Sequence, residues 1–356
     1  MICSISPVML GTNAYHPCMN QLWGWHHART SSISIVPGIR VGHWSDVLAA
    51  TGCTAIVCDH DAVAGVDVRG GATASHEINA LDPCGIVEQI QGVVLAGGSA
   101  PGLVSAHGAV EFFQNQSRGF ATQQGVVPIV PAAALFDRGI GDPTAFPTQA
   151  DGLLACMNAK TEFKRGNVGA GCGAVVGKMR GHLSATKGGL GSAGWETSDG
   201  LKVGALAAVN AFGDISDPDT GTIIAGAQNE DGSPLCTARS LIEAGPSPIG
   251  FGSNTTLCVI ATNAKLTKAQ ATAVARIAQT GISRVVSPCH TQFDGDMVFA
   301  LSMGDHTADL NRIGILAARL VESAILDAVL CADTMHGILS ATDLGWFNPS
   351  SSGASL

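Results

Sequence analysis

Charged side chains are scarce in this sequence, and no long apolar run takes their place. Only 13% of its 356 residues are Asp, Glu, Lys or Arg, and the formal net charge is −9. The 19 lysines and arginines form no dense basic stretch, which argues against nucleic-acid binding as the main role. No run of 18 apolar residues occurs, so we expect no membrane-spanning helix.

The cysteines lack the spacing of a metal site or a disulfide framework. There are 11 of them, an odd number, without any C-x-x-C pair. Several lie in apolar runs, as Cys258 does in LCVIA, and we expect them to be small core side chains in a reducing compartment. The opening residues MICSISPVML show neither a basic segment nor a small-residue cleavage site. We therefore expect no secretory signal and a cytoplasmic protein.

Glycine is abundant instead, and it punctuates short β-rich runs. The 45 glycines and the hydrophobic content of 46% are typical of a globular protein with tightly stacked layers. We expect residues 32–344 to form one layered α/β domain, residues 1–31 a divergent extension and residues 345–356 a flexible tail. Short β-rich runs are predicted in ISIVPGIRVGHW, CTAIVCDHDAVAGVDVRGG and IQGVVLAGGS, and strands in GVVPIVPAAALF, GALAAVNAFGDI and TTLCVIAT.

Three helices are predicted from the apolar periodicity. The first covers residues 101–118 and the last runs from about Arg312 to Cys331. Between them, Thr267 and Gln270 have the spacing of a capping box, so a helix should start there. Its buried face is expected to carry Ala271, Val274, Ala275, Ala278 and Ile282.

The junction between Asn254 and Thr255 is the first candidate for chemistry. A segment rich in glycine and proline, EAGPSPIGFGSN, ends at Asn254, and a predicted strand begins with Thr255. The Thr255 hydroxyl could attack a strained peptide at this place. The freed α-amine, with a reference pKa of about 7.7–8.0, could then act as the base for the same hydroxyl. The plain alternative is an ordinary strand start.

Asp294 and Asp296 are a second candidate. Carboxylates one residue apart in an extended segment project to the same side and could bind a cation, orient a hydroxyl or hold an ammonium group. A calcium loop would need more oxygen ligands at regular spacing, so we expect no metal site; a simple turn is the alternative. Lys178 and Asn210 are lone polar residues at the ends of predicted strands, and each by itself indicates a structural role.

Two glycine turns complete the candidates. Gly98 and Ser99 lie in GGSAPG between a predicted strand and helix, where a phosphate could bind. Neither of the usual phosphate-loop patterns is present, so a tight turn is favoured. Arg69 opens a similar Arg-Gly-Gly turn, which is either structural or part of a pocket wall.

Taken together, these segments resemble the DmpA-type family of L-aminopeptidases/D-esterases and their relatives, the NylC-type nylon-oligomer endohydrolases. The matching pieces follow the family's order over about residues 33–330. They are VDVRGGA, LDP, VVLAGGSAPGL, VPAAALFD, VGAGCGAVVGK, KGGLGSA, GSNTTLCVIATN and PCHTQFDGDMVFAL. The combination is specific, although no single piece is.

The resemblance implies an α-β-β-α four-layer sandwich with two central sheets, related to N-terminal-nucleophile hydrolases and to the ornithine acetyltransferases. It implies a catalytic domain that cleaves itself into an α chain, 1–254, and a β chain, 255–356. Thr255 matches the nucleophile and Asn210 the residue that stabilises the oxyanion. Lys178, Asp294 and Asp296 match residues around the nucleophile in the threonine branch of the family, where the β-peptidyl branch has Ser and a Ser/Glu pair.

One departure from the family concerns the substrate pocket, where Phe136 replaces a tyrosine. The only tyrosine of the chain is Tyr15, in the divergent extension. Because the neighbouring AAAL is apolar, we expect a pocket rebuilt around an apolar wall, in which an added hydroxyl would be costly. Arg69, Gly98 and Ser99 are expected to line the same pocket.

The resemblance leaves the substrate open. It implies an aminopeptidase acting on short peptides, an endohydrolase of 6-aminohexanoate oligomers or, less directly, an acyltransferase. It implies no metal or organic cofactor, no nucleic-acid or membrane partner, and a homo-oligomer, by analogy a tetramer of αβ units.

Overall fold

The computed structural model describes residues 31–244 and 254–346. Most of the expected extension and tail, and the glycine-rich segment before Asn254, lie outside the described residues. None of the described helices is both long and apolar enough to cross a membrane.

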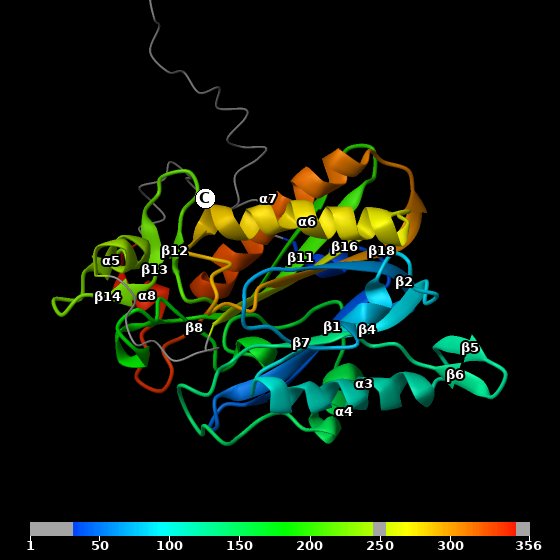
Figure 1. Ribbon diagram of the computed structural model, residues 1–356, viewed down its shortest axis with the longest axis horizontal. Coiled ribbons are helices and arrows are strands. Elements are labelled where there is room, and N and C mark those ends of the chain that lie inside the picture. Colours follow the sequence, from blue (N-terminus) through cyan, green and yellow to red (C-terminus); the bar gives the residue numbers. More distant parts are fainter. Residues whose placement is uncertain (1–30, 245–253, 347–356) are drawn as a thin grey trace, which may run out of the picture.

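The centre of the molecule is one sheet of nine strands (Figure 1). Its order is β10-β11-β16-β18-β2-β4-β7-β3, and β1 pairs with β2 beside this path. The strands are β1 (Ile39–Asp46), β2 (Thr51–Val68), β3 (Ala74–His76), β4 (Gln89–Ala96), β7 (Ala132–Ala134), β10 (Gly189–Glu196), β11 (Lys202–Asn210), β16 (Thr255–Ala264) and β18 (Met297–His306).

The long strand β2 belongs to both halves of this sheet. Residues 51–58 pair with β1, while residues 63–68 pair with β18. Its register with β4 shifts between Val57 and Ala62. Two separate central sheets were expected from the family. In this chain the two β-layers are instead continuous, because β2 carries the hydrogen bonding from one layer into the other.

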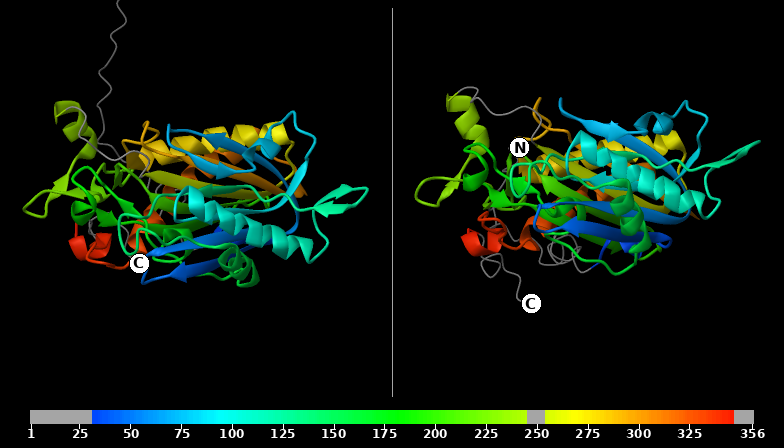
Figure 2. Two further views of the ribbon diagram at one scale, coloured as in Figure 1. Left: turned by 60° about the horizontal axis from the view of Figure 1, so that its bottom comes forward. Right: turned by 90° about the horizontal axis from the view of Figure 1, so that it is seen from below.

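Helices cover both outer faces, so the layers follow the expected α-β-β-α order. Helices α6 (Lys268–Val285) and α7 (Leu310–Leu330) lie on one side, and α3 (Ser105–Gln114) and α4 (Gln149–Met157) lie on the other (Figure 2). A middle cluster, which includes Ile56, Leu206 and Phe299, packs between the two β-layers. Burying apolar side chains on both faces of each β-layer provides the main driving force for this stacking.

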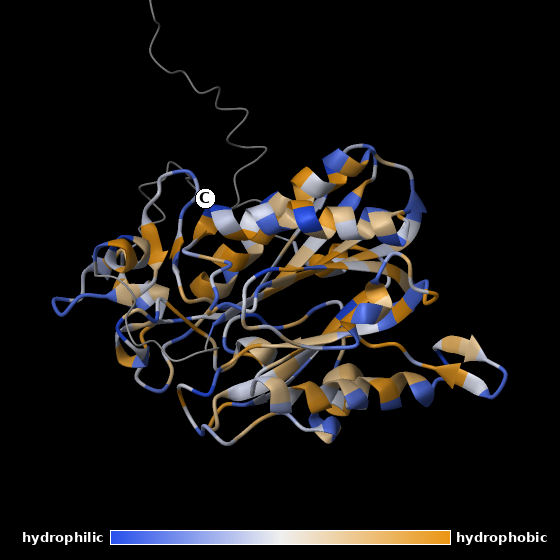
Figure 3. Cartoon of the chain, in the orientation of Figure 1, coloured by the Kyte–Doolittle hydropathy of each residue, from blue (hydrophilic) through white to orange (hydrophobic). Residues whose placement is uncertain are grey.

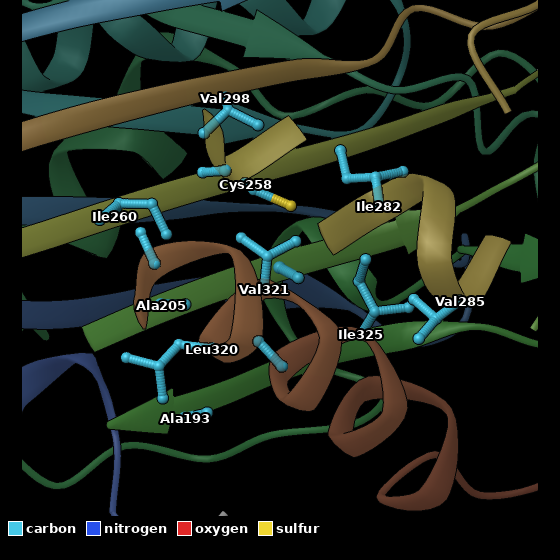
Figure 4. Packing of buried hydrophobic residues seen from close by; sticks show 14 of the residues in the cluster. Ala193, Ala205, Cys258, Ile260, Ile282, Val285, Val298, Leu320, Val321 and Ile325 are labelled. Carbon is cyan, nitrogen blue, oxygen red and sulfur yellow. The ribbon is translucent and has the colours of Figure 1, made fainter. Parts of the chain in front are cut away.

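The cluster under α6 and α7 includes residues of four strands of the central sheet, β10, β11, β16 and β18. Figure 4 shows Ala193, Ala205, Cys258, Ile260 and Val298 of the strands against Ile282, Val285, Leu320, Val321 and Ile325 of the helices. Figure 3 shows hydrophobic colours along the strands and hydrophilic residues on loops and on outer helix turns. Small residues allow close approach here: a Cβ at Gly281 of α6 would lie 2.2 Å from the Ala318 carbonyl oxygen of α7.

Most predicted elements are confirmed, with local corrections. Thr267 and Gln270 form the capping box that starts α6, and the five residues predicted for its buried face are buried. The helix expected over 101–118 is shorter, since a 3-10 turn precedes α3. The single strand expected in GVVPIVPAAALF is wrong. Two prolines interrupt it, leaving an outer hairpin strand, β6, and the buried strand β7.

The remaining elements are short. They are the strands β5 (Phe120–Thr122), β6 (Gly125–Val127), β8 (Val175–Val176), β9 (Thr186–Lys187), β12 (Asp214–Ser216), β13 (Ile223–Ala225), β14 (Ala227–Gln228), β15 (Pro234–Leu235) and β17 (Val286–Ser287). The helices are α5 (Thr237–Ala244), α8 (Ala341–Leu344), η1 (Ile33–Ile35), η2 (Ile78–Leu81), η3 (Ala100–Val104), η4 (Gly169–Gly171) and η5 (His182–Ser184).

Candidate active site

Thr255 lies at the first position of the central strand β16. Its side chain and that of Asn254 are buried, with exposed fractions of 3% and 0%. On one side Thr255 pairs with Asn210, the last residue of the antiparallel strand β11. On the other side Asn254 forms a parallel bridge with Asp294, just before β18. The chain therefore passes through the interior of the sheet at the very junction that the sequence singles out.

Two hydrogen-bond donors lie on the carbonyl oxygen of Asn254. The Thr255 hydroxyl donates to it, and so does the main-chain N–H of Gly295, at 2.9 Å. The Asn254 amide nitrogen is 3.5 Å from the Phe293 carbonyl oxygen. The Thr255 hydroxyl and the carbonyl group of the preceding peptide are thus in contact, and both residues are buried.

Asp296 ties strand β16 to the loop before β18. One carboxylate oxygen accepts from Thr256 N at 2.7 Å. The other accepts from both the main-chain N–H and Nδ1 of His290, at 3.0 and 2.9 Å. Burial opposes a charge on His290, but its hydrogen bonds and charge interactions with Asp296 and Cys289 raise its pKa to about 10. His290 is therefore a cation at neutral pH, and its ring pairs with Asp296 at 2.9 Å.

His290 was not singled out from the sequence. It stands in the piece PCHTQFDGDMVFAL, next to the two aspartates that were. Its backbone has a φ of 56°, a left-handed conformation that non-glycine residues adopt rarely. This conformation lets its main-chain and ring nitrogens reach the same oxygen of Asp296. A non-glycine residue in such a conformation leaves no mark on the sequence pattern.

Asp294 differs from Asp296 in its partners. One of its oxygens accepts from the main-chain N–H and the hydroxyl of Thr291, at 2.9 and 2.6 Å. Burial and the negative charge of Asp296 raise the pKa of Asp294 above its usual range. The two aspartates thus differ in their partners: Asp296 accepts from Thr256 and His290, and Asp294 accepts from Thr291.

The turn that begins at Arg69 supports this loop through its main chain. Arg69 N donates to the Asp296 carbonyl oxygen at 2.8 Å, and Ala72 N donates to that of Asp294 at 2.9 Å. The guanidinium of Arg69 pairs with Asp67 at 2.8 Å. Arg69 therefore contributes to the site by its position in the turn, while its side chain contacts Asp67.

Lys178 and Asn210 meet on the other side of Thr255. Lys178 Nζ donates to the Asn210 carbonyl oxygen at 2.8 Å. Burial lowers the pKa of Lys178 to about 7, against the charges of Asp294 and Asp137, which raise it. The Asn210 side chain accepts from Val175 N at 3.0 Å and donates to the Phe136 carbonyl oxygen at 2.8 Å. These two contacts orient its amide.

Phe136, Gly98 and Ser99 are brought together by a buried carboxylate, Asp137. Asp137 accepts from Gly98 N at 2.7 Å and from the Thr51 hydroxyl at 2.9 Å. Burial raises its pKa to about 6. Ser99 N donates to Leu135 O at 2.9 Å, and Ser99 has a φ of 59°. A strained backbone held by neighbouring groups is common at functional sites. The sequence analysis missed Asp137, whose position after an apolar strand resembles that of any turn residue.

Within the described ranges, no group of three or more His, Cys, Asp or Glu side chains could hold a metal ion. The partners of Asp294 and Asp296 are N–H and O–H donors. What the arrangement offers is acid–base chemistry: a buried hydroxyl, a lysine that is partly neutral at pH 7, and two carboxyl groups, of which Asp294 has a raised pKa.

Comparison with known proteins identifies the family of this chain. The model of peptidase family S58 matches residues 31–342. An uncharacterized aminopeptidase of Mycobacterium tuberculosis is 36% identical over 344 residues, covering 88% of this chain and 98% of its own. A 6-aminohexanoate-oligomer endohydrolase of an Agromyces species is 26% identical, covering 82% of this chain and 84% of its own.

Among solved structures, the L-aminopeptidase D-Ala-esterase/amidase of Ochrobactrum anthropi has the same fold. The TM-score is 0.68 at 21% identity, over 89% of this chain and 92% of the other. That structure is described as a variant of the N-terminal-nucleophile hydrolase fold. The extent of these matches leads to one conclusion: this chain belongs to peptidase family S58 and is an amide-bond hydrolase.

Proposed function

We propose that the chain cuts itself between Asn254 and Thr255 and then hydrolyses amide bonds of short peptides with Thr255 as an N-terminal nucleophile. The observation that carries this proposal is the buried contact between the Thr255 hydroxyl and the Asn254 carbonyl oxygen. A surface threonine at an ordinary strand start would need neither this burial nor the surrounding Lys178, Asp294 and Asp296.

In turnover, Thr255 Oγ attacks the substrate carbonyl carbon and its own α-amine takes the hydroxyl proton. The Asn210 amide, oriented by Val175 N and the Phe136 carbonyl, donates to the tetrahedral oxyanion. The amine proton passes to the leaving nitrogen, and water then hydrolyses the acyl ester. Lys178, when protonated, keeps the amine partly neutral by charge repulsion, while Asp294 and Asp296 orient the amine or hydroxyl of Thr255.

The substrate class that we favour is short peptides cut at their amino end, as the word aminopeptidase in the name of the Mycobacterium tuberculosis relative suggests. A second candidate is the 6-aminohexanoate oligomer. It is favoured by the Thr255, Asp294 and Asp296 combination and by the Agromyces relative. Assaying aminoacyl p-nitroanilides and 6-aminohexanoate oligomers side by side separates the two. Transfer of the acyl group to an added amine instead of water would indicate an acyltransferase.

Intact-protein mass spectrometry tests the self-cleavage directly. We expect two pieces, residues 1–254 and 255–356, with Thr-Thr-Leu-Cys at the amino end of the smaller one. Thr255→Ala should stay whole and inactive because the hydroxyl is lost. Thr255→Ser keeps the hydroxyl and should still be cut. A unique cut elsewhere, or none over days at neutral pH, would refute the assignment of Thr255.

We also propose a homo-oligomer, by analogy a tetramer of αβ units, in the cytoplasm. Several large apolar side chains lie on the surface, including Leu48, Ile86, Leu183 and Ile242, each at least 80% exposed. Covering them in an assembly would remove this apolar area from water. Light scattering at micromolar concentration measures the mass, and a monomer would contradict the proposal.

A further inference from the structure

The self-cleavage step needs an oxyanion donor of its own. When Thr255 Oγ attacks the Asn254 carbonyl carbon, a C–O bond forms and negative charge develops on the Asn254 oxygen. The C–N bond then breaks, the hydroxyl proton ends on the Thr255 nitrogen, and an ester links Asn254 to Thr255 Oγ. One water hydrolyses this ester to the Asn254 carboxylate and the free hydroxyl. Each tetrahedral stage places charge on the oxygen of the Asn254 carbonyl, a group that belongs to the protein itself.

We propose that the main-chain N–H of Gly295 is the catalytic oxyanion donor for self-cleavage, distinct from the Asn210 amide that serves the substrate. This inference rests on the proposed cut between Asn254 and Thr255. Gly295 N lies 2.9 Å from the Asn254 carbonyl oxygen, within the range of effective oxyanion donors. The Asn210 side chain accepts from Val175 N and donates to the Phe136 carbonyl oxygen.

The residue type at 295 agrees with this role. A Cβ at Gly295 would lie 2.8 Å from Thr255 Oγ and 2.8 Å from the Ala72 carbonyl oxygen. Real Cβ contacts of this length do not occur without displacing a neighbour, so only glycine lets this backbone approach the nucleophile so closely. The Asp-Gly-Asp sequence therefore places two carboxylates on either side of one peptide N–H that no side chain shields.

The N–H of Gly295 is also held rigidly. Ala72 N binds the Asp294 carbonyl oxygen at 2.9 Å, and Arg69 N binds that of Asp296 at 2.8 Å. The two carboxylates flanking it are fixed by Thr291 and by His290. A donor that is already in place costs no reorganisation when the charge develops, which is what makes oxyanion donors effective.

An amide-to-ester exchange tests this donor, because it removes one N–H and little else. The chain is made by cell-free translation with glycolic acid at position 295, and loss of the whole chain is followed by mass spectrometry. We expect self-cleavage to slow about 10²–10³-fold, the usual effect of losing one oxyanion donor. The matched control has glycolic acid at position 166. That exchange removes the Gly166 N–H, which donates to the Leu190 carbonyl oxygen at 2.7 Å, and should slow the cut no more than about fivefold.

Chains of the 295 ester that do become cut should turn over an amide substrate at the wild-type rate per free Thr255, because the substrate oxyanion is served elsewhere. Unchanged self-cleavage of the 295 ester, or equal slowing by both esters, would overturn the proposal. If either ester lowers the melting temperature, the two ester chains are compared at temperatures equally far below their own melting points. Slower self-cleavage of the 295 ester than of the control ester then still supports Gly295 N–H as the donor. A wild-type chain that is never cut at Thr255 would instead refute the proposed function.

Discussion

At the scale of single residues, we expect Asn210 to contribute directly to the rate of amide hydrolysis. Asn210→Ala should slow amide hydrolysis about 10²–10³-fold, because one oxyanion donor is lost. The matched control is Asn263→Ala. Asn263 lies near the other end of β16 and its amide also binds main-chain atoms, of Lys202 and Gly200. The rate of amide hydrolysis is measured for both cleaved variants. A rate loss of less than about fivefold in Asn210→Ala, or an equal rate loss in both variants, would mean that Asn210 is structural.

Lys178 should set the pH dependence of self-cleavage. Before the cut, Thr255 has no free amine, so another base must take its hydroxyl proton. Because burial lowers the pKa of Lys178 to about 7, its neutral and basic form is scarce below pH 6 and prevails above pH 8. The cleavage rate should therefore rise between these values and level off above them.

The variant Lys178→Arg checks this expectation. A guanidinium stays protonated over the whole range, so the rise with pH near 7 should vanish and the rate should fall. The charged groups that act on Lys178 are Asp294 and Asp137. A rise with an unchanged midpoint in Lys178→Arg would assign the titration to one of these carboxyls and remove Lys178 as the base.

The surroundings of Phe136 are less apolar than its sequence neighbours indicate. The apolar AAAL before it suggested a wholly apolar pocket wall, yet those alanines and Leu135 face the core, while Phe136 itself is only partly buried. Its next neighbour is the buried carboxylate Asp137, and its carbonyl binds Asn210. In Phe136→Tyr the added hydroxyl would be less buried than expected, because Phe136 is only partly buried. We therefore expect a smaller loss of stability from this substitution.

At the scale of elements, the start of helix α6 should contribute measurably to stability. The Thr267 hydroxyl accepts from Gln270 N, and Gln270 Oε1 accepts from Thr267 N. Thr267→Ala should lower the free energy of unfolding by about 1 kcal/mol, within a range of ~0.5–2. Urea unfolding is best measured in the uncut Thr255→Ala chain. Thr280→Ala, at an exposed position of the same helix, is the control; equal losses would deny the cap its role.

At the scale of the whole molecule, the cut should not separate the two pieces. Strands β16 and β18 follow the cut, yet they pair with β11 and β2, which precede it. Helices α6 and α7 of the smaller piece bury the same cluster as β10 and β11 of the larger one. Separation would expose this core and the edges of both strands.

We therefore expect the cleaved protein to elute as a single species from a sizing column in native buffer. The two pieces should part only in denaturant. The uncut Thr255→Ala chain provides the reference elution volume. Separate elution of the pieces at micromolar concentration would show that the sheet pairing described above does not hold the cleaved enzyme together.

The sequence by itself determined the features that depend on short-range residue patterns. The capping box of Thr267, the apolar face of α6 and the strand that begins at Thr255 depend on neighbours a few residues away, so they could be predicted. The order of motifs also led to the family, and with it to Thr255, Asn210, Lys178, Asp294 and Asp296.

Only the tertiary structure decided the rest, because it depends on contacts between distant segments. The passage of β2 through both β-layers comes from pairing with β1, just before it in the sequence, and with β18, far after it. The pairing of His290 with Asp296 needs an unusual backbone conformation at 290. The contact of Gly295 N–H with Asn254 joins residues 41 positions apart through one main-chain hydrogen bond. A main-chain donor is present at nearly every residue, so no sequence pattern can single one out; packing alone selects it.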